Sequence, residues 1–332
     1  MIVRLRTRIR AGRRRTRTAP FSIALGLLAV CAAGTSAQIA AFQTGCLNAG
    51  GAAAACAAAS DIAEIAGLRA LLLGAGGSPV AGTASTLGHR LPGSPRWSVT
   101  ARMTGARIVL PDPGAPGATL DGTGIGWNAD LAVGVIDGIP AFATVGGVGS
   151  IDLLASLGSV NLPGAAGFGT RSPLTWGAGA RVGVMRESFT VPGISVSAMY
   201  RRLGSFSAGD AVQSGGGVQV RSPSASAWSL RAGVGKRISL FGVTAGFGWD
   251  RLSSEIVADI GAPSGSVAIE DDSYVSSRTL LFGGLLWTRL VYSLSAEFGW
   301  QRGGGAIEDD RSPASDARGG GFFLSFAGRL VI

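Results

Sequence analysis

The sequence predicts an all-β protein, a transmembrane antiparallel up-and-down β-barrel of about ten strands preceded by a short N-terminal helical segment. Three observations lead there: a presequence, period-two alternation from Trp97 to the chain end, and tryptophans placed at strand ends. Hydrophobic residues make up 46% of the chain and the mean hydropathy is +0.35. No stretch after the presequence runs to about 18 apolar residues, so helical spans are not expected. Apolar content without long apolar runs is typical of strands that face lipid.

The N-terminus resembles a secretory signal peptide. Residues 1–18 carry eight arginines and no acid, an apolar run follows over 21–34, and small residues end at Ala37. A basic region, a short apolar region and a small-residue cut site predict cleavage after Ala37. Removing these eight charges from the 29 basic residues leaves 21 against 20 acidic ones. Eight of the nine net positive charges therefore belong to residues 1–37, and no nucleic-acid partner is expected.

Residues 38–95 differ in composition from the rest and are expected to form a periplasmic N-terminal segment. Cys46 and Cys56 predict a local disulfide in an oxidising compartment, the alternative being two buried free thiols. Asp61 and Glu64 are spaced as a helix N-cap with a reciprocal acid, and apolar residues follow at helical spacing to Leu73. The predicted helix 61–73 either plugs the barrel or rests on its periplasmic mouth.

The remaining residues, 96–332, are expected to form the barrel, because apolar and polar residues alternate there with the strand period. The predicted strands cover 97–104, 127–135, about 140–151, 174–184, 194–200, 228–234, 241–249, 278–288, 292–300 and 322–332. Two of them, 140–151 and 278–288, alternate less clearly. Long predicted connectors (110–123, 152–172, 206–225, 252–276 and 303–318) take turns with short ones (137–140, 186–192, 236–239 and 288–290). Short periplasmic turns and long external loops are typical of outer-membrane barrels.

Tryptophan positions supply an independent test. The alternation places five at the outer rim and two at the inner rim, as an aromatic girdle at each membrane interface requires. The rim residues are Trp127, Trp176, Trp228, Trp249 and Trp300 outside, with Trp97 and Trp287 inside. A soluble secreted β-sandwich, the alternative fold, explains the alternation but not these positions.

The last strand carries a family resemblance. Phe322, Leu324, Phe326, Leu330 and Ile332 alternate to the end of the chain. This pattern resembles the C-terminal assembly signal of bacterial outer-membrane barrels, small porin-like barrels included, although Ile332 stands where the family usually has Phe. The resemblance implies a place in the outer membrane of a diderm bacterium. It also implies outer-membrane lipid and the barrel-assembly machinery as partners.

The inward-facing positions of the predicted strands contain charged side chains among small polar neighbours. They are Arg102, Asp130, Arg181, Arg231, Glu297 and Arg329. Two alternatives follow: a water-filled pore in which arginines favour a small anionic solute, or a lattice of ion pairs that fills a narrow interior.

Two predicted loops repeat an acidic string. Clustered carboxylates are hard ligands of the kind calcium prefers, although neither string has the spacing of a defined calcium loop. The candidate ligands are Glu270, Asp271 and Asp272, with Glu308, Asp309 and Asp310.

We expect no enzyme and no cofactor. His89, the single histidine, precedes the barrel, and the sequence contains no nucleophile elbow, phosphate loop or zinc-ligand spacing. The leading hypothesis is a non-enzymatic barrel, either a narrow porin-like channel or a structural barrel. A surface adhesin or receptor that acts through long extracellular loops is the alternative.

Overall fold

The computed structural model describes most of the chain after residue 34. The described residues are 35–53, 55–57, 59, 70–90, 94–111, 119–140, 146–161, 174–209, 218–222, 225–262, 265–303 and 320–332. The predicted signal peptide lies outside them except for 35–37, which begin helix α2 (Thr35–Asn48). Cys46 and Cys56 are joined by a disulfide with a Cα–Cα distance of 5.8 Å. None of the described helices is long and apolar enough to cross a membrane.

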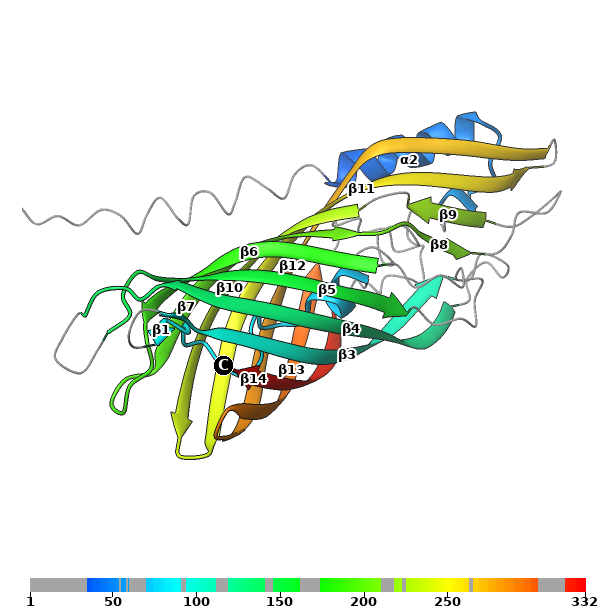
Figure 1. Cartoon of the computed structure of the whole chain (residues 1–332). Helices are drawn as coiled ribbons and strands as arrows, with labels where there is room; N and C mark the ends of the chain where they lie inside the picture. Colours follow the sequence, from blue (N-terminus) through cyan, green and yellow to red (C-terminus); the bar gives the residue numbers. More distant parts are fainter. Residues whose placement is uncertain are drawn as a thin grey trace, which may run out of the picture. The chain divides into compact units, whose positions relative to one another are not determined.

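The strands form a closed antiparallel barrel of ten (Figure 1). Neighbours along the chain pair with one another, β14 pairs with β3, and β10 pairs with β7 and β11, so the ring has no open edge. The barrel strands are β3 (Trp97–Pro111), β4 (Thr119–Ile136), β5 (Ser150–Asn161), β6 (Leu174–Met185), β7 (Gly193–Leu203), β10 (Ala225–Ile238), β11 (Phe241–Ala262), β12 (Gly265–Arg289), β13 (Tyr292–Gly303) and β14 (Gly321–Val331).

Two short hairpins accompany the barrel. Strand β8 (Phe206–Gly209) pairs with β9 (Val218–Ser222), which extends the sheet along the far part of β11. Strands β1 (His89–Arg90) and β2 (Ser94–Pro95) pair just before the barrel begins.

The predicted long loop 252–276 is wrong. Strands β11 and β12 stay paired from Phe241–Trp287 to Ala262–Gly265, with one irregularity between Ser254 and Ile256. Only residues 263–264 connect them. The alternation in the sequence reports contact with lipid, whereas the backbone ladder continues into water because its hydrogen bonds do not depend on lipid.

The predicted fifth element is also displaced. The sequence pattern places a strand at about 140–151 and a loop at 152–172, but β5 covers Ser150–Asn161. Inside the barrel this strand presents Asp152 and Leu154, an acid and an apolar residue. Leu154 packs with Val80 and Leu87, which precede the barrel in the chain. Because this inward position is apolar, the alternation of apolar and polar residues that identifies a strand is interrupted here.

A belt of exposed apolar side chains surrounds the barrel, as lipid contact requires. At one edge of the belt the rings of Trp176, Tyr200 and Trp228 form a chain across β6, β7 and β10, with centroids 6.1 and 5.4 Å apart. At the other edge Trp287 contacts Tyr292, with ring centroids 6.0 Å apart. All seven tryptophans occupy outward positions, Trp249, Trp287 and Trp300 half-buried and the others exposed.

The two ends of the barrel, called the turn end and the loop end, carry different connections. The turn end carries the connections 239–240 and 290–291 and the C-terminus; the loop end carries the Trp176–Trp228 ring chain and the β11–β12 extension. Beyond Trp127 on the loop side, exposed Arg107 pairs with Asp121, and this hydrogen bond lowers the pKa of the Asp121 carboxyl. An outward ion pair at this height marks the limit of the lipid belt.

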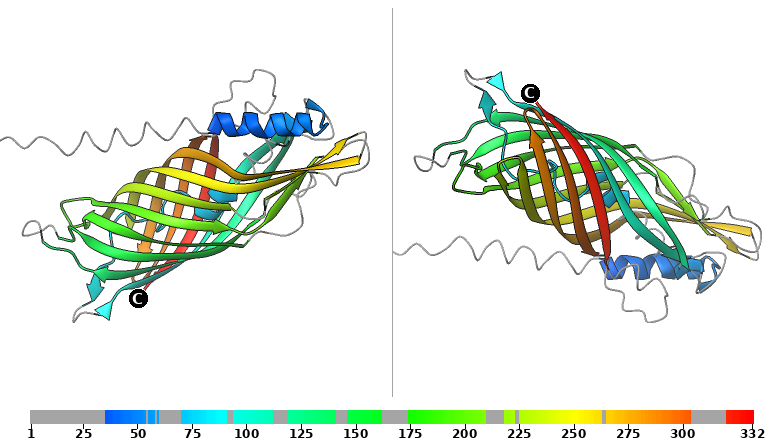
Figure 2. Two further views of the ribbon diagram at one scale, coloured as in Figure 1. Left: turned by 90° about the horizontal axis from the view of Figure 1, so that it is seen from above. Right: turned by 90° about the horizontal axis from the view of Figure 1, so that it is seen from below.

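Residues 70–88, called the lumen segment, run through the barrel. Gly74 lies against Val160 and Thr175 near the loop end, and Gly88 lies against Gly134 near the turn end. Figure 2 shows α2 and the C-terminus at opposite ends of the barrel. Residues 61–69 of the predicted helix lie outside the described residues, while 70–75 are helical. Residues 70–88 of the expected N-terminal segment thus lie inside the lumen, against inward-facing side chains of the wall.

The lipid belt yields a test on strand β10. Ala232 faces outward midway along the belt, and Ser226 faces outward beyond Trp228. We expect Ala232→Arg to reduce the free energy of unfolding from phospholipid vesicles by about 2–4 kcal/mol, because the charge enters hydrocarbon. The matched Ser226→Arg is expected to change it by less than about 1 kcal/mol. Urea titration of both variants measures this; equal costs would contradict the placement of the belt.

Candidate functional site

The barrel interior is lined by ten buried charged side chains in the described residues, six basic and four acidic. They are Arg102, Asp130, Asp152, Arg181, Arg201, Arg231, Asp250, Arg278, Glu297 and Arg329. All six of the charged residues expected at inward positions are among them. The excess of two positive charges is the same as in the sequence-based set of four arginines and two acids.

Four inward charges were missed: Asp152, Arg201, Asp250 and Arg278. Asp152 lay in a predicted loop, and Arg201 and Asp250 each follow the last residue of a predicted strand. Extending each of these two strands by one residue would have included Arg201 and Asp250. In the two-residue alternation Arg201 lies on the same inward face as Ser197, and Asp250 on the same face as Gly248. For Arg201 and Asp250 the error is therefore one of strand boundaries, which sequence patterns define least well, whereas Arg278 begins a predicted strand that is apolar on both faces.

Most of these charges form short buried ion pairs. The arginine–carboxylate distances are 2.6 Å for Arg102–Asp130, Arg181–Asp152, Arg231–Asp250 and Arg278–Asp250. Every side chain involved is at most 7% exposed. The paired arginines are held against the wall, and three of them, Arg102, Arg181 and Arg231, direct a further N–H group at the lumen segment.

In the middle of the barrel, charged side chains bind the main chain of the lumen segment. Glu297 accepts hydrogen bonds from the Gly77 N–H at 2.9 Å and the Ser78 N–H at 3.0 Å. Arg231 donates to the Gly77 carbonyl at 2.9 Å, and Arg102 to the Ser78 carbonyl at 2.6 Å. Both peptide groups are thus satisfied by side chains of three different strands, as buried backbone polar groups require.

A second set of contacts lies nearer the turn end. Both carboxylate oxygens of Asp152 accept from the Leu87 N–H at 3.1 Å, while Arg181 donates to the Thr83 carbonyl at 3.2 Å. The hydroxyls of Thr86 and Ser150 lie 2.6 Å apart. Asp152 therefore neutralises Arg181 and binds the segment at once.

Near the loop end, the segment is held by fewer polar contacts and more apolar ones. Asn128 donates to the Leu73 carbonyl at 3.2 Å, and Leu71, Leu72 and Leu73 are fully buried. Gly126 allows the close approach, because a Cβ there would lie 2.2 Å from the Leu73 oxygen.

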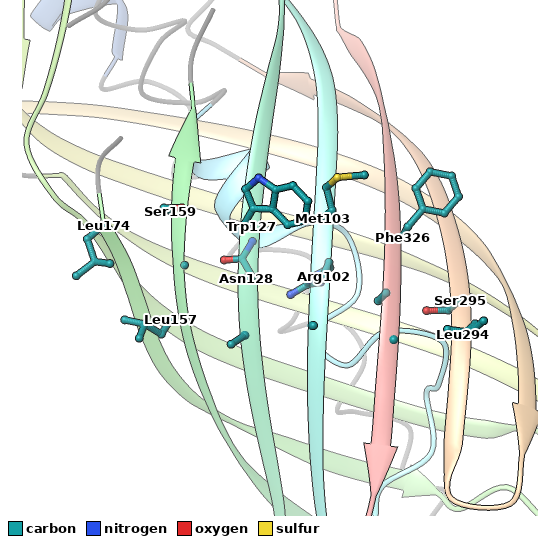
Figure 3. Close-up of a pocket in the computed structure, with 15 residues that line it drawn as sticks. Arg102, Met103, Trp127, Asn128, Leu157, Ser159, Leu174, Leu294, Ser295 and Phe326 are labelled. Atoms are coloured by element: carbon teal, nitrogen blue, oxygen red, sulfur yellow. The ribbon is translucent and has the colours of Figure 1, made fainter. Parts of the chain in front are cut away.

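Little space remains between the lumen segment and the wall where the structure shows gaps. One gap, beside Pro79 and Phe282, has room for about 10 Å³, roughly a single water molecule. A second, beside Met199 and Arg201, has no room for water. A hollow of about 710 Å³ lies instead on the outer wall, around Met103, Trp127 and Phe326 (Figure 3), within the belt of exposed apolar side chains.

Two arginines in the interior have no carboxylate partner among the described residues. Arg201 is 4% exposed and contacts the Met199 sulfur at 3.3 Å, and its Nε has no hydrogen-bond partner there. Arg329 is 9% exposed, and its Nε and one terminal nitrogen have none. These two residues account for the positive excess.

The remaining site predictions fall largely outside the description. Of the calcium candidates, Glu308–Asp310 lie outside the described residues; Glu270–Asp272 belong to β12, with side chains that are not described. His89 is in β1, and its side chain is likewise not described. In the described part of the chain, no group of three His, Cys, Asp or Glu is arranged to hold a metal ion.

Fold and lining define the class: this chain is a closed antiparallel β-barrel of ten strands with an apolar outer belt, an arrangement typical of barrels that span a membrane. No protein-family description matches it, and no curated protein matches its sequence. Several solved structures are similar to it at low identity.

Three of these structures illustrate the range of the fold. The translocator domain of autotransporter NalP from Neisseria meningitidis is 12% identical, over 82% of this chain and 96% of that chain, with a TM-score of 0.43. The outer membrane protease OmpT from Escherichia coli is 11% identical, over 75% and 100%, with a TM-score of 0.33. A mutant of the TodX monoaromatic hydrocarbon channel is 10% identical, over 71% and 89%, with a TM-score of 0.31. At these values the likeness concerns the fold alone.

The double role of Asp152 predicts a large loss of stability. Asp152→Ala leaves the Arg181 guanidinium, 1% exposed, without its counter-charge. We expect the free energy of unfolding to fall by about 3–5 kcal/mol. Asp121→Ala is the matched control, since it breaks the exposed pair with Arg107 and is expected to cost little stability, because water already screens both charges. Urea unfolding in detergent micelles checks both, and similar losses would mean that the interior pair carries no special weight.

Proposed function

We propose that this protein is a non-enzymatic structural barrel that is closed by its own lumen segment and anchors the preceding residues at the outer face of the membrane. The observation that carries the proposal is the direction of the lumen segment, which enters at the loop end and leaves at the turn end. Its order of contacts is Asn128, then Glu297 and Arg102, then Asp152.

The direction of the segment decides which side its N-terminal neighbours occupy. Outer-membrane barrels have short turns and both strand termini on the periplasmic side, which makes the loop end external. Residues before 70 join the lumen segment at the loop end, and α2 contacts β12. The disulfide-closed residues 46–56 would therefore be presented outside the cell.

Closure favours the structural role over the porin-like channel. Eight of the ten described charged groups that would line a pore are engaged with one another or with the main chain of residues 77–87, and Arg201 and Arg329 are the exceptions. If the segment were displaced, the excess of two positive charges would favour a small anion. The channel is thus a state that the segment prevents.

An adhesin or receptor role is the second candidate. The specific observation is the β11–β12 extension, which continues for 13 residues beyond Trp249 to Ala262 and carries β9 on one edge. A long, paired hairpin presents a firmer surface to a partner than a loose loop does. Removing residues 255–272 while cell binding persists would exclude it.

The chemistry of the interior also supports a non-enzymatic role. Asp130 pairs with Arg102, and Glu297 is hydrogen-bonded to two amides, so neither is free to take a proton from a substrate. The two gaps described between the lumen segment and the wall hold at most about one water molecule.

Surface presentation is tested with an epitope inserted between Ala49 and Gly50, both exposed. We expect antibody to bind intact cells that carry this insertion. The same epitope at the Leu290–Val291 turn is the control, because this turn lies at the opposite end of the barrel and should be detected only after the outer membrane is permeabilised. The reverse pattern would overturn the proposed orientation.

Closure is tested in planar bilayers. The wild-type protein is expected to show no steady conductance, because the lumen segment fills the interior. A stable open state in the wild-type protein would restore the porin-like channel. Heat-modifiable migration in SDS gels establishes beforehand that the sample contains folded barrels.

A further inference from the structure

The contacts of residues 76–78 show a feature that plugging alone does not require: the wall recognises main-chain atoms. The two N–H groups and two carbonyls of Gly77 and Ser78 all bind charged side chains, with donor–acceptor distances of 2.6–3.0 Å for the closest contacts. The Ser78 hydroxyl donates to the Val80 carbonyl within the segment and contacts no wall residue in these bonds. The specificity here therefore lies in backbone shape and not in side-chain identity.

The wall also selects glycine. A Cβ at position 77 would lie 2.6 Å from the Glu297 Oε1 atom and 2.8 Å from Phe282. Gly76 has a φ of +61°, a backbone conformation that other residues seldom adopt, and a Cβ there would lie 2.8 Å from Arg102. Two adjacent glycines followed by a small residue fit against Glu297, Phe282 and Arg102, whereas larger residues at positions 76 and 77 do not.

The two arginines that bind residues 77 and 78 are held in position by the wall itself. Asp130 holds Arg102 and Asp250 holds Arg231, each at 2.6 Å, and both acids belong to the wall. Arg278 binds the second oxygen of Asp250 at 2.6 Å. Because wall residues fix these arginines, their arrangement does not depend on the covalent link between the barrel and the lumen segment.

We propose that Glu297, Arg102, Arg231 and Phe282 form a peptide-binding site for a glycine–glycine turn, filled in the resting protein by residues 76–78. The ligand class is a peptide with this turn, and its own lumen segment is the occupant joined in cis. A peptide supplied in trans binds the same atoms when the resident turn is displaced. The inference extends the proposed function, since it names what holds the barrel closed and what would exchange with it.

The test uses the full chain with Gly77→Ala and a synthetic peptide with the native sequence of residues 70–88. The added methyl group weakens the resident turn, so the variant is expected to conduct in planar bilayers. Adding the native peptide is expected to block this conductance. A peptide with Gly77→Ala should bind at least about tenfold more weakly, because overpacking of a tight site typically costs this much or more. A peptide with Ser78→Ala keeps every wall contact and should block nearly as well as the native one.

Binding is measured separately by the fluorescence anisotropy of a labelled peptide. Conductance in the wild-type protein would contradict the proposed closed state. The ratio of the affinities of the native and Gly77→Ala peptides would still show whether the peptide-binding site exists. Equal binding of these two peptides, or a Gly77→Ala barrel that remains closed, would overturn the site.

A second variant guards against failure of Gly77→Ala to fold, which heat-modifiable migration reveals. Glu297→Gln keeps the shape of the side chain and removes the charge that accepts both N–H groups. It is expected to conduct and to bind the native peptide at least about tenfold more weakly than the Gly77→Ala barrel does, because hydrogen bonds to a charged acceptor are the stronger ones. Undiminished peptide binding by Glu297→Gln would also contradict the proposal.

Discussion

The structure depends on one arrangement: charged side chains of the barrel wall that bind the main chain of a segment inside it. Glu297 and Asp152 accept from backbone N–H groups, and Arg102, Arg181 and Arg231 donate to carbonyls. A backbone in a dry interior loses its water partners, and each unpaired group is costly. Here the charged side chains of the wall supply those partners, so the wall and the segment stabilise one another.

This arrangement explains why parts of the wall do not look like a pore. A water-filled lumen requires polar inward residues, yet Leu154, Leu280, Phe282 and Leu286 face inward and are buried. Leu154 packs with Val80, and Phe282 and Leu286 lie against Gly77 and Gly82. The inner face therefore combines polar positions, which bind the backbone of the segment, with apolar ones, which pack against it.

The outer face is governed by a different solvent. Exposed apolar side chains and the Trp176–Tyr200–Trp228 ring chain satisfy a hydrocarbon layer and its interface. The Arg107–Asp121 pair lies where that layer ends, and the β11–β12 hairpin continues past it. Because the membrane constrains only the belt, the strands are free to extend beyond it, and the part of the molecule beyond the belt is larger than the lipid pattern implies.

The sequence by itself determined the barrel, its approximate strand number, its lipid face and six of the inward charges, because a membrane strand must alternate wherever lipid lies on one side. It did not determine β5 or the length of β11 and β12, where the inner or outer neighbour is neither lumen water nor lipid. Which charge meets which, and that residues 70–88 pass between them, was decided only by the tertiary structure. The period of a strand specifies the face on which a residue lies but carries no information about what stands opposite.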